Sequence, residues 1–164
     1  MKGYELFIAY RNDLSNYSLE QLRHIPEKGV WSIGQMYDHL IVVSHEYLDS
    51  MEACAGRMDE QTYGKTPAGE KLFQMGGFPA IKIRLPDEMN APPNNSASQE
   101  ELMNRIEEVI LRLMQWELKS EAINPNFKVE HGGFGWLNAK EWYVLVEMHA
   151  RHHLKQQEEL ESYL

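Results

Sequence analysis

Three features are scarce in this chain of 164 residues: cysteine, long apolar runs and clustered positive charge. Cys54 is the only cysteine, so no disulfide can form within the chain. No uninterrupted apolar run approaches the roughly 20 residues that a membrane-spanning helix needs. Residues Met1–Leu6 also lack the apolar core of a signal peptide. We therefore expect a soluble, cytoplasmic protein that does not bind a membrane.

The charge balance argues against nucleic acid as a partner. The formal net charge is −9, which repels a phosphate backbone. No cluster of lysines and arginines offers a patch for phosphate contacts. A chain with 43% hydrophobic residues can build one sizeable core, and no internal repeat indicates a second unit. We therefore treat residues 1–164 as a single domain whose expected partner is a small molecule.

Four segments of the chain carry apolar residues at helical spacing. The first runs from Leu6 to Gln21, and Pro26 follows it. The second begins at Ser32, which forms a capping-box pattern with Gln35, and ends near Gly56.

The third and fourth segments also begin at capping residues. The third starts at Ser98, with Glu101 three residues on, and ends near Glu121. The fourth starts at Asn138, with Glu141 three residues on, and continues almost to the C-terminus. Four amphipathic helices predict an all-α protein built as a four-helix bundle.

About 40 residues separate the second and third helices, which is too long for a simple turn. This connection is rich in glycine and proline, and Ala80–Leu85 alternates apolar and basic residues between two prolines. That alternation predicts a short strand or an extended strap. A crossover of this length can run along a bundle, which allows the second and third helices to be parallel.

Three histidines share the inward faces of two helices. His149 and His153 are one turn apart, about 40° around the helix axis, so they can point at the same object. His39 lies in the apolar stripe of the second helix. A lone inward histidine is usually hydrogen-bonded in the core, but three buried imidazoles without a shared partner are costly. One divalent ion would satisfy all three, so we predict a metal site.

Spacing alone leaves one ligand open, because His152 is three residues from His149 and could replace His153. The three-four repeat of the inward stripe favours His153 modestly. The remaining histidines have ordinary interpretations. His131 is a weaker candidate for a ligand or substrate contact and is interpreted as a loop histidine, while His45 and His24 are assigned no role.

Two stretches together resemble the DinB-like superfamily, which includes YfiT-type hydrolases and bacillithiol-type thiol transferases. Trp31–Leu40 carries W-S-I followed by D-H-L, and His149–Gln156 reads H-x-x-H-H-x-x-Q. The resemblance implies an up-down-down-up bundle with one divalent ion, commonly nickel or zinc, on His39, His149 and His153. It also implies activation of water or of a low-molecular-weight thiol such as bacillithiol at the metal. Family members often pair through helix faces, so it further implies a homodimer.

Three imidazoles leave at least one coordination position open, as in catalytic zinc sites. This predicts a thiol transferase or hydrolase with an unidentified catalytic base. Glu46 and Tyr47 are candidates for a base or proton donor, and loop 132–136 and Phe78 are candidates for the pocket wall. A noncatalytic metal-binding or ligand-binding bundle, and a metal-free bundle with hydrogen-bonded histidines, are the competing hypotheses.

The histidine ligands also need groups that orient them, since a metal-bound histidine usually donates its other N–H to an oxygen. Four nearby side chains are candidates, and among them Gln156 has the best helical phase. They are Asp38, Glu147, Gln156 and Gln157.

Overall fold

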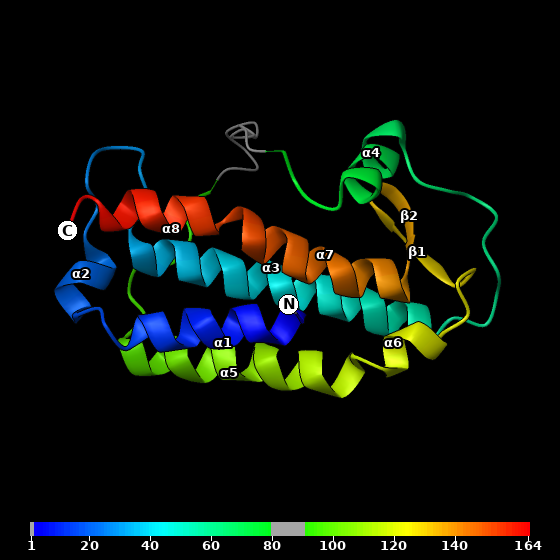
Figure 1. Ribbon diagram of the computed structural model, residues 1–164, viewed down its shortest axis with the longest axis horizontal. Helices are drawn as coiled ribbons and strands as arrows, with labels where there is room; N and C mark the ends of the chain where they lie inside the picture. The colour runs from blue at the N-terminus through cyan, green and yellow to red at the C-terminus, as the bar shows by residue number, and fades with distance from the viewer. Residues whose placement is uncertain (1, 80–90) are drawn as a thin grey trace.

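The computed structural model describes residues 2–79 and 91–164, which are mostly helical with one small two-stranded sheet. Four longer helices lie along one another in Figure 1: α1 (Gly3–Leu14), α3 (Ile33–Ala55), α5 (Gln99–Trp116) and α7 (Ala139–His152). Shorter helices follow or link them: α2 (Leu19–Arg23), α4 (Pro67–Met75), α6 (Lys119–Ala122) and α8 (Leu154–Glu161). The expected all-α character is correct in outline, with a hairpin added.

The four longer helices enclose the hydrophobic core. α3 packs against both α7 and α5, and α1 packs against α5 and α7. In Figure 1, α1 and α7 run toward the end where the C-terminus lies, whereas α3 and α5 run away from it. The largest fully buried side chains include Phe7, Tyr10 and Tyr37, which come from α1 and α3.

The first predicted helix is wrong in its length, because the chain breaks it in two. α1 ends at Leu14, and α2 begins only at Leu19. Ser18 caps α2 by accepting a hydrogen bond from the Gln21 backbone at 3.1 Å, and the Gln21 side-chain oxygen accepts one from the Ser18 backbone N–H. A serine that can cap a new helix competes with continuation of the old one.

The second and third predicted helices correspond to α3 and α5. Ser32 and Gln35 form the predicted capping box, and α3 ends at Ala55, directly before Gly56. Ser98 caps α5 by accepting from the Glu101 backbone at 3.1 Å, and α5 ends at Trp116, with α6 reaching Ala122.

The fourth predicted helix is nearly continuous, with one interruption at His153 between α7 and α8. The backbone N–H of His153 still donates to the carbonyls of His149 and Ala150, at 3.3 and 3.2 Å. The Tyr10 hydroxyl also donates to the Ala150 carbonyl, at 2.6 Å. This extra donor lies at the turn where the helix is interrupted, a recognised way to perturb a helical ladder.

The connection between α3 and α5 contains α4, a helix that the sequence analysis did not predict. Thr66 caps it by accepting from the Gly69 backbone, Pro67 occupies its first turn, and Gly76 ends it with a left-handed φ of 75°. The expected strand or strap at Ala80–Leu85 lies outside the described residues.

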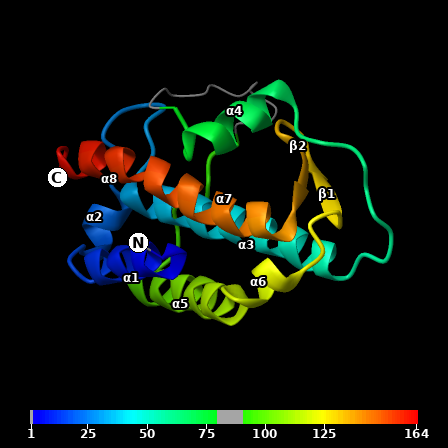
Figure 2. The ribbon, with the colours of Figure 1, turned by 45° about the vertical axis from the view of Figure 1, so that its right-hand side comes forward.

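The sequence analysis also missed a β-hairpin between α6 and α7. Strand β1 (Lys128–His131) pairs antiparallel with β2 (Gly135–Asn138), so that Val129 faces Leu137. The hairpin lies against α4, and Figure 2 shows the hairpin beside the ends of α3 and α7. Backbone bonds join the two parts, from Thr66 to the Phe134 carbonyl at 3.0 Å and from Trp136 to the Gly64 carbonyl at 3.1 Å.

Glycine permits this close approach. A Cβ on Gly69 would lie 2.1 Å from the Phe134 carbonyl oxygen, and one on Gly135 would lie 2.6 Å from the Thr66 nitrogen. The Thr66 hydroxyl adds a hydrogen bond to the Gly133 carbonyl at 2.8 Å. α4 and the hairpin therefore form one docked unit, called here the α4–hairpin unit (residues 64–76 and 128–138).

Two further observations bear on the initial expectations. Among residues 2–79 and 91–164, no helix combines the length and apolar character needed to cross a membrane. Cys54 is fully buried in α3, where its Sγ lies 3.5 Å from the Leu137 carbonyl of β2. Burial raises the pKa of this thiol to about 11, so it is protonated at neutral pH.

Candidate metal centre

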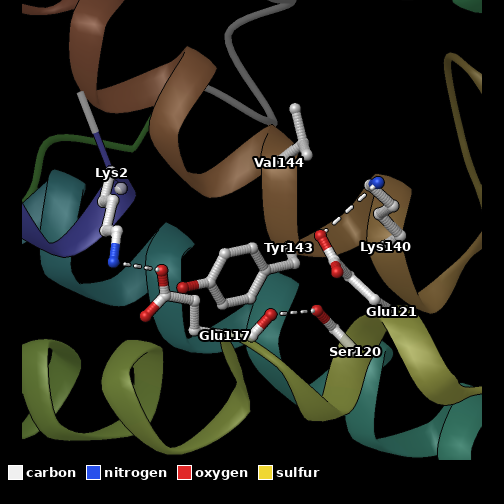
Figure 3. Close-up of a pocket in the computed structure, with 8 residues that line it drawn as sticks. Lys2, Glu117, Ser120, Glu121, Lys140, Tyr143 and Val144 are labelled. Atoms are coloured by element: carbon white, nitrogen blue, oxygen red, sulfur yellow. Dashed lines mark hydrogen bonds and ion pairs between the residues drawn. The ribbon is translucent and has the colours of Figure 1, made fainter.

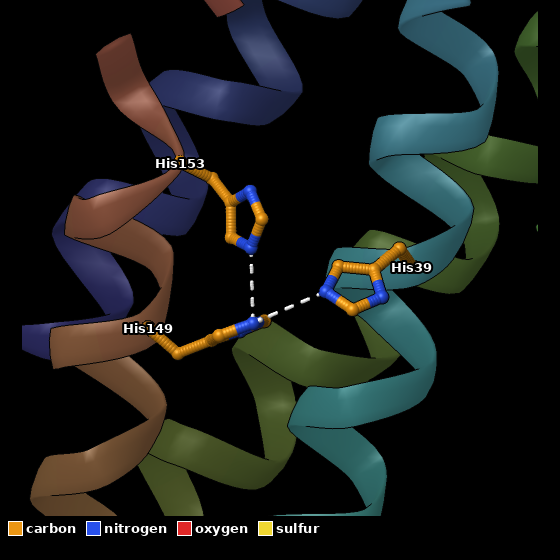
Figure 4. Close-up of side chains that lie close together, drawn as sticks. All are labelled: His39, His149 and His153. Carbon is orange, nitrogen blue, oxygen red and sulfur yellow. Dashed lines mark hydrogen bonds between the residues drawn. The ribbon is translucent and has the colours of Figure 1, made fainter. Parts of the chain in front are cut away.

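The structure brings together three predicted ligands from two helices. His39 projects from α3, His149 from α7, and His153 from the junction of α7 and α8 (Figure 4). The Nε2 atom of His149 lies 3.2 Å from that of His39 and 3.0 Å from that of His153. One nitrogen from each ring falls within 4.8 Å of the others. Nitrogen ligands about 2.0–2.1 Å from one tetrahedral zinc ion would be about 3.3 Å apart, which is similar spacing.

Gln156 fixes the orientation of one ring. Its side-chain oxygen lies 2.7 Å from Nδ1 of His153, so it accepts a hydrogen bond from that nitrogen. A neutral imidazole carries only one N–H, which leaves a lone pair on Nε2 of His153. That lone pair points toward His149. Gln156 therefore acts as the orienting group that the sequence analysis ranked first.

Hydrogen bonding alone cannot satisfy this arrangement. His149 can donate its Nε2–H to the lone pair on His153, but the same nitrogen then has no lone pair left for His39. Only one of the two short contacts can therefore be a hydrogen bond between neutral rings. A cation that receives all three Nε2 lone pairs removes the conflict, so the donor set fits a divalent ion.

The burial of His149 supports the same assignment. This side chain is only 8% exposed. Burial, followed by repulsion from the neighbouring histidines, holds its pKa well below the usual range. The ring is therefore neutral at physiological pH, which is the form that coordinates a metal.

The other two rings are also held in the neutral form. Burial lowers the pKa of His153 to about 4, even though the Gln156 hydrogen bond acts in the opposite direction. Burial also lowers the pKa of His39, with Asp38 opposing it. The Trp31 ring packs against His39 with centroids 5.1 Å apart. All three imidazoles are therefore available as ligands without losing a proton.

The geometry separates His152 from His153. His152 contributes no nitrogen to the cluster; its ring packs against Phe78 instead, with centroids 5.5 Å apart. Phe78 also contacts the His149 ring at 6.1 Å. The inward repeat that favoured His153 thus agrees with the position of the side chains.

Three of the four candidate orienting groups have structural roles elsewhere. Asp38 accepts from the Asn94 backbone at 3.1 Å and pairs with Arg105 at 2.8 Å, joining α3 to α5. Glu147 pairs with Arg151 at 3.0 Å, and Gln157 donates to Asp13 at 3.1 Å.

A group of contacting aromatic rings extends from His149 along α7 toward the hairpin. The Tyr47 ring lies 5.8 Å from that of His149 and 5.7 Å from that of Trp142. It also lies 6.0 Å from the ring of His131. Glu46, considered beside Tyr47 as a base, is exposed.

His131 is the residue whose environment the sequence analysis missed. It ends β1, stacks on Phe134 with ring centroids 4.5 Å apart, and is half-buried. Its burial depends on the pairing of β1 with β2. Each strand has only four residues, so the local sequence predicts this pairing weakly. The Gly-Gly pair after His131 is a turn signal from which the hairpin could have been predicted.

A separate cavity of about 170 Å³ lies away from the histidines, where α1, α6 and α7 meet (Figure 3). Its charged groups are already paired. Lys2 contacts Glu117 at 3.2 Å and Lys140 contacts Glu121 at 3.6 Å. The Tyr143 hydroxyl donates to the Leu113 carbonyl at 2.8 Å. We assign no function to this cavity.

The family model of the DinB superfamily matches residues 9–157, which is most of the chain. The chain belongs to the DinB superfamily. Comparison with curated proteins and with solved structures finds no significant match. The DinB superfamily match and the three converging histidines together fit an enzyme-like protein with a metal site.

Proposed function

We propose that this DinB superfamily protein is a metal-dependent enzyme that catalyses thiol transfer or hydrolysis. His39, His149 and His153 would hold one divalent ion, with nickel and zinc as the leading candidates. Such an ion lowers the pKa of a coordinated thiol or water and so supplies a nucleophile at neutral pH. The expected partner is a small molecule, with a low-molecular-weight thiol such as bacillithiol as one candidate.

The observation that carries this proposal is the pair of short contacts from Nε2 of His149 to the Nε2 atoms of His39 and His153. The Nε2 atom of His149 lies 3.0 Å from that of His153 and 3.2 Å from that of His39, and neutral imidazoles cannot complete both hydrogen bonds. A three-histidine site also leaves a position for a substrate, as catalytic zinc sites do. A closed structural site would instead need a fourth protein ligand.

The protein side chains would do the remaining work. Gln156 holds the His153 ring in the tautomer that presents Nε2, at a hydrogen-bond distance of 2.7 Å. The Trp31 and Phe78 rings flank His39 and His149, where they would exclude water from the ligands. Low local polarity strengthens the electrostatic effect of a bound cation.

We also infer that α1, α3, α5 and α7 form the up-down-down-up bundle implied by the family resemblance. The packing of α3 between α5 and α7 supports this order, as do the helix directions in Figure 1. In such a bundle the metal ties α3 to the end of α7.

Elemental analysis of the purified protein tests the metal assignment, with His39→Ala, His149→Ala and His153→Ala prepared identically. We expect close to one divalent ion per wild-type chain and little in each variant. His152→Ala is the matched control, because His152 is next to a proposed ligand but outside the cluster. It should retain the metal.

The outcomes separate the competing hypotheses. Absence of stoichiometric metal after reconstitution with nickel and zinc would refute the proposal. Stoichiometric metal without thiol-transfer or hydrolase activity toward a broad substrate panel would instead favour the noncatalytic bundle. Activity that follows metal content across the four variants would support an enzyme.

A further inference from the structure

One buried N–H group, on the far side of the Tyr47 ring from His149, has no acceptor among the described residues. The indole nitrogen of Trp142 makes no hydrogen bond to any described residue, although the side chain is only 3% exposed. Trp142 lies on the same face of α7 as His149, two turns earlier. A buried donor without a partner costs free energy, and such groups are uncommon in native proteins.

His131 presents a second N–H donor. Its Nδ1 accepts two backbone hydrogen bonds, from Gly133 at 3.0 Å and from Phe134 at 3.1 Å. Both partners are N–H groups, so Nδ1 must carry the lone pair. The neutral ring therefore bears its proton on Nε2, which is free to donate. The hairpin turn fixes this tautomer.

Tyr47 joins these two donors to the metal centre. Its ring contacts those of His131, Trp142 and His149, with centroids between 5.7 and 6.0 Å apart. The His131 and Trp142 rings lie 5.4 Å from each other. A tyrosine hydroxyl is protonated at neutral pH and can donate. The three side chains that carry these donors thus lie side by side, one ring beyond a proposed metal ligand.

We propose that Tyr47, His131 and Trp142 form a donor subsite that binds an acceptor oxygen of the molecule held at the metal. The inference rests on the proposed function. Three neutral histidines leave the charge of a divalent ion uncompensated, so the site favours an anionic molecule. The substrate class is therefore a thiol that carries a carboxylate some bonds away from its sulfur, with an apolar stem against the aromatic rings.

Cobalt(II)-loaded protein provides the test, because thiol ligation changes its visible absorption. The probes are mercaptoacetate, mercaptopropionate, mercaptobutyrate and mercaptohexanoate, each compared with an alkanethiol of equal chain length. We expect at least one mercaptocarboxylate to bind about tenfold more tightly than its alkanethiol, as hydrogen bonds to a charged group would provide. Cysteamine, whose ammonium group cannot accept, should show no such gain.

Variants assign the preference to individual donors. Tyr47→Phe and Trp142→Phe each remove one donor and keep a ring. His131→Asn keeps a side-chain oxygen for the turn and removes the Nε2–H donor. We expect each variant to lower the ratio of mercaptocarboxylate affinity to alkanethiol affinity. His24→Asn changes an exposed histidine outside the site and should behave as wild type.

Each result has a definite meaning. Alkanethiol binding without a carboxylate preference would overturn the donor subsite alone. A preference that survives in all three variants would do the same. Failure of every thiol to bind the cobalt protein would overturn thiol activation, and the subsite with it. Loss of alkanethiol affinity in the variants would show that these residues only shape the metal centre.

Discussion

At the scale of single residues, Gln156 determines which nitrogen of His153 faces the cluster. We predict that Gln156→Ala weakens zinc binding by about 10-fold to 100-fold, the usual effect of removing a group that orients a metal ligand. Gln156→Glu should retain affinity, because a carboxylate also accepts from Nδ1. Competition with a chromophoric chelator measures both, and Lys155→Ala, an exposed neighbour, is the control. Equal affinities in all variants would contradict the orienting role.

The lowered histidine pKa values predict how the stability of the metal-free protein depends on pH. The pKa of His153 is about 4 in the folded chain against an ordinary 6.5, so the unfolded chain binds more protons between these values. The free energy of unfolding should therefore fall as the pH falls from 6.5 toward 4. His39 and His149 shift in the same direction.

Urea unfolding in the presence of a chelator, repeated across this pH range, measures the effect. His153→Gln should show a shallower dependence, because it removes one buried group that resists protonation. Slopes that match between the wild type and the variant would argue against a neutral, buried His153.

Sequence reasoning performs well for individual histidines on helices. Helical phase placed His39 and His149 on inward faces and modestly favoured His153 over His152, and the structure brings the nitrogens of His39, His149 and His153 together. It could not decide the role of His131, whose burial depends on strand pairing and on contact with Tyr47 from α3. Local spacing carries information about a residue's own helix and little about partners distant in the chain.

At the scale of elements, the α4–hairpin unit depends on glycine at two contacts, and the contact at Gly69 is the closer one. We predict that Gly69→Ala destabilises the protein by about 1–3 kcal/mol, the usual cost of overpacking, because its Cβ would lie 2.1 Å from the Phe134 oxygen. Gly64→Ala is the matched control, since nothing lies within 4 Å of its Cβ. Urea unfolding compares the two, and equal stabilities would show that the contact is loose.

The elements that sequence reasoning missed are the short ones. α4 had recognisable signals in Thr66, Pro67 and Gly76, but the sequence analysis treated the connection around it as a long crossover and predicted local structure only at Ala80–Leu85. The hairpin strands have four residues each, too few for alternation to be distinctive. The break after Leu14 follows from Ser18, whose capping role is visible only once Gln21 is paired with it. Long amphipathic helices bury enough apolar area to dominate the pattern, whereas these elements depend on tertiary contacts.

At the scale of the whole molecule, a metal on His39 and His153 would link α3 to the end of α7. We predict that zinc stabilises the folded protein by about 4 kcal/mol when the free ion is about 1,000 times its dissociation constant. Denaturation with and without zinc measures this gain. His153→Ala should lose it and His152→Ala should retain it. A gain that persists in His153→Ala would place the stabilising ion elsewhere.

The burial of Cys54 has a practical consequence for experiments on this protein. Its thiol is the only one in the chain and is protonated and fully covered in the folded state. Alkylating reagents should therefore modify it only when the protein unfolds enough to expose the core. The labelling rate then measures global unfolding. Because Cys54 is buried and protonated, any thiolate signal at the metal should come from an added molecule.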